Sequence, residues 1–375
     1  MRVLHINCNY IGTALHRVMF RRLNQNGGHK VFVPSDGRES WKSFQPEADE
    51  AVAECFQRRD RYLFFKKQAQ ILQALEGIYD VSQFDCIHAY TLFTDGNCAM
   101  TLSEKYGIPY VVAVRNTDLN GFFKRRKLLY FRGLRILKNA SAVFFLSQEY
   151  QTQLLDRYIP YRMRDSLLKK SYVIPNGIDP FWLENPAPPK SEEDLSRMEK
   201  GDLRLLFVGR INRYKNPTRA ALAAEELCRR GYDVTFTAVG KVEEAWMLEE
   251  MEKGKSFTYL PPRPKEELLT IYRQNDMLVM PSHDETFGLV YPEAMTQGLP
   301  VIYSIGEGFY GQFPEGTVGY AVNPDRTESV VKMILYAAKY CRRIIPRCAE
   351  AARRFNWDDI IKRYEEIYRA VTGKE

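Results

Sequence analysis

The 375-residue sequence has few of the signals that mark metal-binding, membrane-spanning or secreted proteins. Its seven cysteines form no C-x-x-C pair, so we expect reduced thiols in a cytoplasmic protein. No apolar run approaches the roughly 18 residues of a membrane-spanning helix, and an expected strand begins at once, so we expect no secretory leader. The histidines show no metal-ligand spacing, and we expect no metal; they are His5, His16, His29, His88 and His283.

Glycine is scarce where nucleotide-binding enzymes need it. Residues 8–13, after the first expected strand, contain one glycine where a dinucleotide-binding fingerprint requires three. The chain also lacks the G-x-x-x-x-G-K-[ST] sequence of phosphate-binding loops. These absences argue against an NAD-dependent enzyme and a P-loop NTPase.

What the sequence does contain is an alternation of short β-branched or aromatic runs with helical stretches. Such strands, separated by roughly 10–15 helical residues, indicate βαβ units with right-handed crossovers. We therefore predict an α/β protein of two doubly wound, Rossmann-like domains with parallel sheets facing across a cleft. The expected strands are 2–7, 30–34, 85–89, 110–114, 142–146, 172–174, 204–208, 233–239, 257–260, 277–280, 301–304 and 318–322.

A polar stretch rich in proline and charge separates the two series of strands. We interpret residues 186–202 as a linker between an N-terminal domain, 1–185, and a C-terminal domain, 203–356. Residues 1–190 contain 27 basic and 18 acidic side chains, whereas the remainder contains 27 and 29. An anionic partner is therefore expected to meet the N-terminal half.

Two cations follow the first strand of the second domain. Gly209 and Arg210 come directly after the strand, and Lys215 lies five residues beyond Arg210. Open α/β sheets bind ligands at this edge, and a planar guanidinium with a compact ammonium suits a diphosphate. A solvated basic turn explains this segment, taken alone, equally well.

A longer motif, residues 281–302, follows the strand 277–280 and leads into a helix. The backbone N–H groups of Phe287, Gly288 and Leu289 would point outwards at the helix start and favour an anion. Glu293, one turn inside the helix, would accept hydrogen bonds from the two hydroxyls of a ribose. Glu285 would reach a group attached to the far phosphate. Two glutamates that merely stabilise a helix N-terminus explain Glu293 but not the Phe-Gly-Leu spacing.

Together these residues establish a resemblance. Glu285 and Glu293, with seven residues between them, resemble the E-x7-E signature of retaining glycosyltransferases of the GT-B fold, family 4 (glycosyl transferases group 1). The resemblance runs over most of the chain, and its other segments are 173–179, 208–215, 272–282 and 355–357. It implies that the last helix, 357–375, packs back onto the N-terminal domain.

The resemblance also implies a reaction. A sugar would move from a nucleotide-diphosphate sugar, with UDP or GDP as the expected nucleotide, without a metal or other cofactor. Arg210 and Lys215 would neutralise the departing diphosphate, where charge grows in the transition state. Glu293 would hold the ribose and Glu285 the hydroxyls of the transferred sugar. The loop 304–308 would correspond to a glycine-rich turn that faces the phosphates.

The acceptor side departs from the family pattern. Arg115 stands where many relatives have a histidine, and Asp118 stands where relatives often have an aspartate. Because an arginine cannot act as a base, we favour a front-face mechanism in which the departing phosphate oxygen takes the acceptor proton. Gly12 and His88 are further acceptor-side candidates. A plain turn glycine and a satisfied strand-end histidine are the alternative interpretations.

Residues 121–138 contain seven basic and no acidic side chains, interleaved with aromatic and aliphatic ones. This pattern predicts a basic amphipathic helix that contacts an anionic membrane surface, with a solvated face above a buried stripe as the alternative. Membrane docking would indicate a peripheral protein on the inner face of the cell membrane. The acceptor would then be a lipid-linked saccharide in cell-envelope or exopolysaccharide biosynthesis.

Two other functions stay open. A nucleotide-sugar hydrolase or epimerase would use the same site without an acceptor, and a non-catalytic polyanion-binding protein would use the basic half. No recognisable nucleic-acid module occurs, so we expect no nucleic-acid partner.

Overall fold

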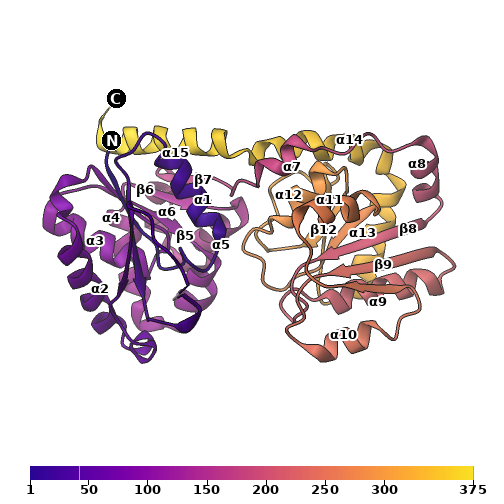
Figure 1. Ribbon diagram of the computed structural model, residues 1–375, viewed down its shortest axis with the longest axis horizontal. Helices are drawn as coiled ribbons and strands as arrows, with labels where there is room; N and C mark the ends of the chain where they lie inside the picture. The colour runs from indigo at the N-terminus through magenta and orange to yellow at the C-terminus, as the bar shows by residue number, and fades with distance from the viewer. Residues whose placement is uncertain (42, 375) are drawn as a thin grey trace. The chain divides into compact units, whose positions relative to one another are not determined.

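The computed structural model describes residues 1–41 and 43–374, and the chain forms two compact units (Figure 1). Unit 1 comprises Met1–Leu146, Tyr150–Ile174 and the segment from Trp357 to the C-terminal end. Unit 2 comprises Ser147–Glu149 and Pro175–Asn356. Each unit contains one parallel sheet, of seven and six strands respectively. The predicted α/β architecture of two doubly wound domains is confirmed.

The sheet of unit 1 has the strand order β3-β2-β1-β4-β5-β6-β7. Its strands are β1 (Val3–Ile6), β2 (Lys30–Ser35), β3 (Glu50–Glu54), β4 (Cys86–Ala89), β5 (Tyr110–Val114), β6 (Ala142–Phe145) and β7 (Ser171–Val173). All the strands expected here from the sequence are present. The edge strand β3 was not expected, because its sequence Glu-Ala-Val-Ala-Glu has a single β-branched residue.

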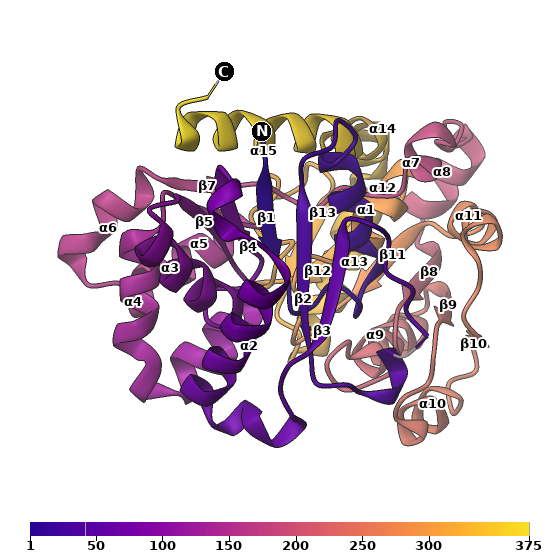
Figure 2. The same cartoon turned by 60° about the vertical axis from the view of Figure 1, so that its left-hand side comes forward.

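Helices cover both faces of this sheet, and each strand contributes alternate side chains to the two faces. Val3 of β1 packs with α15 on one face, whereas Leu4 and Ile6 pack with α2 and α3 on the other. Figure 2 shows α2, α3 and α4 side by side. The helices are α1 (Ala14–Leu23), α2 (Phe64–Ile78), α3 (Thr94–Tyr106), α4 (Tyr130–Asn139), α5 (Gln148–Tyr158), α6 (Tyr161–Leu168) and α15 (Trp357–Thr372), with the short η1 (Glu39–Trp41), η2 (Arg58–Tyr62), η3 (Val81–Gln83), η4 (Asp118–Phe123) and η5 (Lys127–Leu129).

The basic segment 121–138 is not the single helix that its pattern predicts. It comprises the end of the π-helical turn η4, the short helix η5 and most of α4. The break lies at Arg126, whose φ of −115° and ψ of 65° are not helical. Burial of Phe123 within unit 1 sets the direction of the chain before the break.

The sheet of unit 2 has the order β10-β9-β8-β11-β12-β13. All the strands expected here from the sequence are present. Its strands are β8 (Asp202–Val208), β9 (Asp233–Val239), β10 (Phe257–Leu260), β11 (Met277–Met280), β12 (Val301–Ser304) and β13 (Gly319–Val322). Its helices are α7 (Pro180–Glu184), α8 (Glu192–Glu199), α9 (Pro217–Arg229), α10 (Ala245–Met251), α11 (Lys265–Arg273), α12 (Val290–Thr296), α13 (Thr327–Lys339), α14 (Cys341–Ala352) and the short η6 (Arg353–Phe355).

The stretch 186–202, expected to be a linker, instead contains helix α8. Ser191 caps this helix by accepting a hydrogen bond from the N–H of Asp194 at 3.1 Å, and three acidic residues occupy its first turn. Met198 is buried, and Arg342 of α14 forms ion pairs with Glu192 and Glu199. These contacts make the stretch part of unit 2, which already begins at Pro175.

Within the described residues, none of the helices combines the length and the hydropathy that crossing a lipid bilayer requires.

Candidate active site

The predicted donor-site residues lie where the strand order of unit 2 reverses. Strands β8 and β11 are neighbours in the sheet. The chain that leaves β8 crosses over to β9 on one side of this pair, and the chain that leaves β11 crosses over to β12 on the other side. Doubly wound sheets bind ligands at the carboxyl ends of such strands. The loop 209–216 follows β8 and the loop 281–289 follows β11, so both expected motifs meet at this switch point.

The loop after β8 is fixed by its backbone. The Gly209 N–H donates to the Val239 carbonyl at 2.9 Å, and Ile211 is buried and bridges to Val242. Gly240, at φ +151°, allows this close approach, since a Cβ there would lie 1.8 Å from the Gly209 oxygen. The segments that follow β8 and β9 are therefore held together by backbone contacts, and these contacts fix the start of the loop that carries Arg210 and Lys215.

The two predicted cations have different environments. Arg210 is exposed, and its Nη1 atom lies 3.5 Å from the Glu243 carboxylate. Asn212 donates to the other oxygen of Glu243 at 2.7 Å, and this bond together with Arg210 lowers the pKa of Glu243. Arg210 is thus an exposed cation at the rim of the site, paired with Glu243.

Lys215 is instead largely buried and contacts Glu285. Its Nζ atom lies 2.6 Å from Oε2 of Glu285, and the two side chains are only 15% and 9% exposed. The next residue, Asn216, adopts the left-handed conformation at φ 54°, and its side chain donates to the carbonyls of Pro281 and Pro324 at 3.0 Å each. Asn216 therefore joins the loop after β8 to the loop after β11.

A second loop, 305–308, holds Glu285 by its backbone. The Glu285 N–H donates to the carboxylate of Glu307 at 2.8 Å, and the Gly308 N–H donates to the Glu285 carbonyl at 2.8 Å. A Cβ at Gly308 would lie 1.9 Å from the Thr286 oxygen, so only glycine fits there. Glu307 lies in the loop 304–308 that was expected to face the phosphates, but its contact with the Glu285 N–H was not predicted, because nothing in the local sequence indicates this tertiary contact.

The Phe-Gly-Leu segment forms the entrance to helix α12. Phe287 is buried and packs edge-on against Phe309 and Phe355. Gly288 has φ +79°, and a Cβ there would lie 2.4 Å from the Tyr291 ring. The N–H groups of residues 287–289 have no hydrogen-bond acceptor within the described part of the chain. These three amides are available to an anion.

Glu293 lies in the first turn of α12 and is half-buried. The Tyr272 hydroxyl donates to its Oε2 atom at 3.4 Å. Burial, with the charge of Asp179 as a smaller contribution, raises the pKa of Glu293 to about 7. At neutral pH its carboxyl group is therefore divided between the protonated and ionised forms.

The acceptor-side residues belong to unit 1. Asp118 is buried, and its carboxylate accepts the N–H groups of Arg115, Leu92 and Phe93 at 2.9, 3.1 and 3.3 Å. Burial raises the pKa of Asp118 to about 6. Through its two carboxylate oxygens, Asp118 therefore holds the backbone of the loop after β4 against that of the loop after β5.

Arg115 extends from the end of β5. Its Nε donates to the Tyr90 carbonyl at 3.1 Å, and its two Nη atoms have no hydrogen-bond acceptor among the described residues. Gly12 donates its N–H to the Asn9 carbonyl at 3.1 Å in a turn after β1. A Cβ at Gly12 would make only ordinary contact, so this turn does not require glycine.

His88 lies in the interior of unit 1. As the third residue of β4 it points to the sheet face covered by α15, where Nδ1 lies 2.6 Å from the Tyr368 hydroxyl. Its ring stacks on Tyr90 at 4.3 Å, and burial holds its pKa well below the usual value. The structure therefore places His88 away from any surface that an acceptor could reach.

Asp95, which sequence reasoning missed, lies at the switch point of unit 1. It follows β4 and accepts hydrogen bonds from the Cys8 N–H at 3.2 Å and the Thr91 hydroxyl at 3.0 Å. Burial raises the pKa of Asp95 to about 7. Its place in the first turn of the helix after a strand is the one local signal that points to it.

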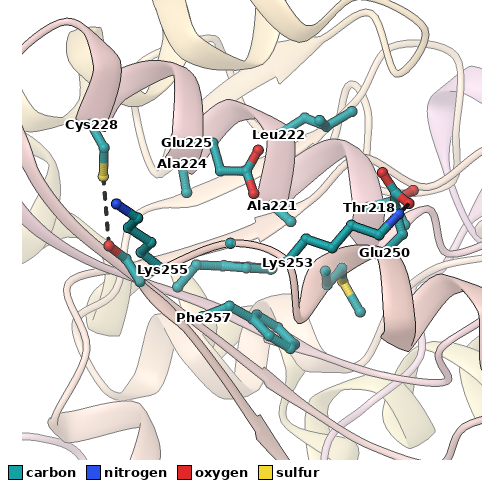
Figure 3. A pocket seen from close by; sticks show the side chains of 14 residues that line it. Thr218, Ala221, Leu222, Ala224, Glu225, Cys228, Glu250, Lys253, Lys255 and Phe257 are labelled. Carbon is teal, nitrogen blue, oxygen red and sulfur yellow. Dashed lines mark hydrogen bonds and ion pairs between the residues drawn. The ribbon is translucent and has the colours of Figure 1, made fainter.

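A cavity of about 450 Å³ lies elsewhere in unit 2, between α9, α10 and the amino end of β10 (Figure 3). Leu222 and Phe257 contribute apolar walls, and Lys253 and Lys255 project beside them. It contains none of the predicted site residues, which lie at the carboxyl ends of the strands.

Family models match both halves of the chain. The model described as Glycosyltransferase Family 4 matches residues 19–181, and the model described as Glycosyl transferases group 1 matches residues 191–348. A D-inositol 3-phosphate glycosyltransferase of Nocardia farcinica is 30% identical over 309 residues, which cover 77% of this chain and 67% of that protein.

Solved structures share the fold. Sucrose-phosphate synthase from Thermosynechococcus elongatus is similar with a TM-score of 0.74 and 17% identity, over 100% of this chain and 99% of that one. HepE from Anabaena, in complex with UDP and glucose, is similar with a TM-score of 0.63 and 17% identity, over 98% of each chain. The chain therefore belongs to glycosyltransferase family 4, the glycosyl transferases group 1, and has the GT-B fold.

Proposed function

We propose that the protein is a retaining glycosyltransferase that moves a sugar from a UDP- or GDP-linked donor to a hydroxyl of an acceptor. The proposal rests on one observation: the Lys215–Glu285 pair lies beside three amides, of residues 287–289, that have no hydrogen-bond acceptor among the residues the structure describes, at the switch point of unit 2. Such a point is where doubly wound sheets bind ligands. The fold similarity to a protein that holds UDP and glucose supports a nucleotide-sugar donor.

Lys215 and the amides of residues 287–289 would bind the diphosphate. An ammonium group has three donors, so Lys215 can keep its contact with Glu285 and still donate to a phosphate oxygen. Arg210, exposed at the rim, would close onto the diphosphate from solvent. These groups would stabilise the charge that grows on the leaving phosphate, and we propose that they do so without a metal ion.

Glu293 would hold the ribose of the donor. With a pKa raised to about 7, its carboxyl group can accept a hydrogen bond from one ribose hydroxyl and, when protonated, donate to another. Glu285, fixed by Glu307 and Lys215, would orient the hydroxyls of the transferred sugar. Preorganised contacts of this kind lower the barrier because nothing has to reorient during the reaction.

On the acceptor side we propose that Arg115 binds an anionic group. Its unpartnered Nη atoms form a planar fork suited to phosphate, and the guanidinium cannot take a proton from the acceptor. The departing phosphate oxygen would take that proton, as in a front-face mechanism. A relative's name specifies a phosphorylated polyol, which supports an anionic acceptor.

We further propose a lipid-linked saccharide as this acceptor, with residues 121–138 contacting an anionic membrane surface. The enzyme would then act as a peripheral protein on the inner face of the cell membrane, in polysaccharide biosynthesis.

A thermal-shift panel of UDP, GDP, ADP and their sugars tests the donor site. A ligand at a hundred times its Kd stabilises the native state by about 2.7 kcal/mol. Glu293→Ala should abolish most of that shift, whereas Glu285→Ala should keep it and lose turnover. Glu266 is an exposed glutamate on α11, and Glu266→Ala is the matched control, which should keep both the shift and the turnover. A protein that no nucleotide stabilises would contradict the proposal.

Product analysis tests the stereochemistry. NMR of the glycosidic product should show the anomeric configuration of the donor, and an inverted product would contradict the retaining mechanism. Release of free sugar at the same rate with and without acceptor would instead indicate a hydrolase.

A further inference from the structure

Unit 1 exposes large apolar side chains at the starts of three helices. Leu128 is 98% exposed, Tyr161 87%, Tyr62 80%, Phe131 79% and Phe65 65%. Single exposed apolar residues are common, but a contiguous group of them marks an interaction surface. Two of the three segments, around residues 62–65 and 161, lie outside the basic segment 121–138.

Ring contacts beneath these side chains join the segments around residues 62–65 and 121–138 and reach Tyr158, just before Tyr161. Phe65 packs on Phe64, and the Phe122 ring lies 6.4 Å from Phe64 and 4.6 Å from Phe93. From Phe93 the contacts continue to η4, α4 and α5: Phe93–Phe123 at 5.0 Å, Phe123–Tyr130 at 6.1 Å, Tyr130–Phe131 at 5.3 Å and Phe123–Tyr158 at 4.9 Å. The Tyr130 hydroxyl donates to the Tyr158 carbonyl at 2.9 Å. The starts of α2 and α4 and the end of α5 thus share one aromatic base, and α6 begins three residues after Tyr158. Figure 2 shows where these helices lie in unit 1.

Positive charge predominates around four of the five exposed side chains, those of the segments 58–66 and 121–138. The segments 58–66 and 121–138 together contain one acidic residue, Asp60, which is buried and paired with Lys66 at 2.8 Å. The guanidinium of Arg126 lies over the Phe122 ring at 5.1 Å. Exposed cations of these two segments are Arg58, Arg59, Lys66, Lys124, Arg125, Lys127, Arg135 and Lys138. Near Tyr161 the charge is mixed, because Arg162, Asp156 and Asp165 are all exposed.

We propose that this aromatic–basic face, formed by the five exposed side chains and the cations around them, docks onto an anionic lipid bilayer. Aromatic and leucine tips enter the boundary between headgroups and acyl chains, and lysine and arginine pair with anionic headgroups. A second copy of the same face is disfavoured because it presents the same charge. The inference deepens the proposed lipid-linked acceptor, on which its biological purpose rests.

The face also connects directly to the acceptor-side residues. The π-helical turn η4 begins at Asp118, which binds the Arg115 N–H, and ends at Phe123 in the aromatic base. A docked protein would therefore hold Arg115 a short stretch of chain from the bilayer surface. This placement suits an acceptor whose phosphate lies at the headgroups.

Vesicle sedimentation of the full-length protein tests the proposal. We expect binding to vesicles of phosphatidylcholine with phosphatidylglycerol and little binding to phosphatidylcholine alone. Replacing Lys124, Arg125 and Lys127 by Gln should lower the partition coefficient about a hundred-fold, which corresponds to about 1 kcal/mol per cation. The variant Leu128→Ser with Phe131→Ser should also weaken binding. Trp246→Ser, a 55% exposed aromatic on α10 of unit 2, is the matched control and should bind as the parent does.

Any of three binding results would overturn the proposal, as would the self-association described next: equal binding to both kinds of vesicle, apolar variants that bind like the parent, or salt-sensitive RNA binding stronger than vesicle binding. Dimers that the Leu128 and Phe131 changes dissociate would assign the face to self-association instead. The assay contains neither donor nor acceptor, so its result is independent of whether the protein transfers a sugar. Circular dichroism melts should show all variants folded, since the replaced side chains are exposed.

Discussion

Replacing Glu293 by Gln should stabilise the protein above neutral pH while it weakens nucleotide binding. The Glu293 carboxyl group is half-buried, and its pKa is raised from 4.5 to about 7. Below pH 4.5 the Glu293 carboxyl group is protonated in both the folded and the unfolded chain, so it does not lower the free energy of unfolding. As the pH rises from 4.5 to 7 the unfolded chain releases it first, and stability falls. Above pH 7 the full penalty remains, about 3 kcal/mol.

Urea denaturation followed by circular dichroism measures this effect. Glu293→Gln keeps the shape of the side chain and an acceptor for Tyr272. The variant should exceed the parent by about 3 kcal/mol at pH 8 and by less than about 1 kcal/mol at pH 5. Glu266→Gln, on the exposed side of α11, controls for the general loss of a charge. A difference of the same size at both pH values would refute the reasoning, because a neutral packing effect does not titrate.

Three further outcomes follow from the contacts of the site. Glu307→Ala should lower kcat more than it raises the donor KM, because the Glu285 N–H loses its acceptor. Glu307→Gln keeps an acceptor and should retain most of the activity. Steady-state kinetics that show equal losses of activity in both variants would contradict this role. Asp118→Ala should cost about 2–3 kcal/mol in urea denaturation, since three N–H groups lose their acceptor, and an unchanged midpoint would show that these bonds are replaced. Turnover should persist after dialysis against EDTA, and its loss with recovery on adding a divalent metal would show that the cations alone do not neutralise the diphosphate.

Most of the fold follows from the sequence because parallel strands buried on both faces are nearly continuous apolar runs. Runs such as 110–114 and 277–280 are of this kind, and both are fully buried strands. Besides the break in the basic segment at Arg126, two expectations fail for local reasons. The edge strand β3 is only half-buried, so its sequence shows no such run. Helix α8 has a high charge and little apolar surface, so its stretch resembles a linker until α14 is seen to pair with it.

Within the proposed donor site, the sequence alone reaches the residues whose spacing is local. The interval from Glu285 to Glu293 is a property of one loop and one helical turn. The contact of Lys215 with Glu285 joins residues 70 positions apart, and that of Glu307 with the Glu285 N–H joins residues 22 apart. No local pattern records such contacts. The same reasoning explains His88, whose environment depends on which face of β4 the last helix covers.

The close packing at Gly308 has a consequence for how the proposed donor site can move. Because the Thr286 carbonyl fills the place of a side chain there, and because Glu285 bonds to both Glu307 and Gly308, the two loops are interlocked. Neither can shift without displacing the other, so any adjustment to an arriving nucleotide is a joint motion of both segments. Lengthening either loop by one residue would break its hydrogen bonds to the other loop. Insertions in these two loops are therefore a poor way to engineer donor preference.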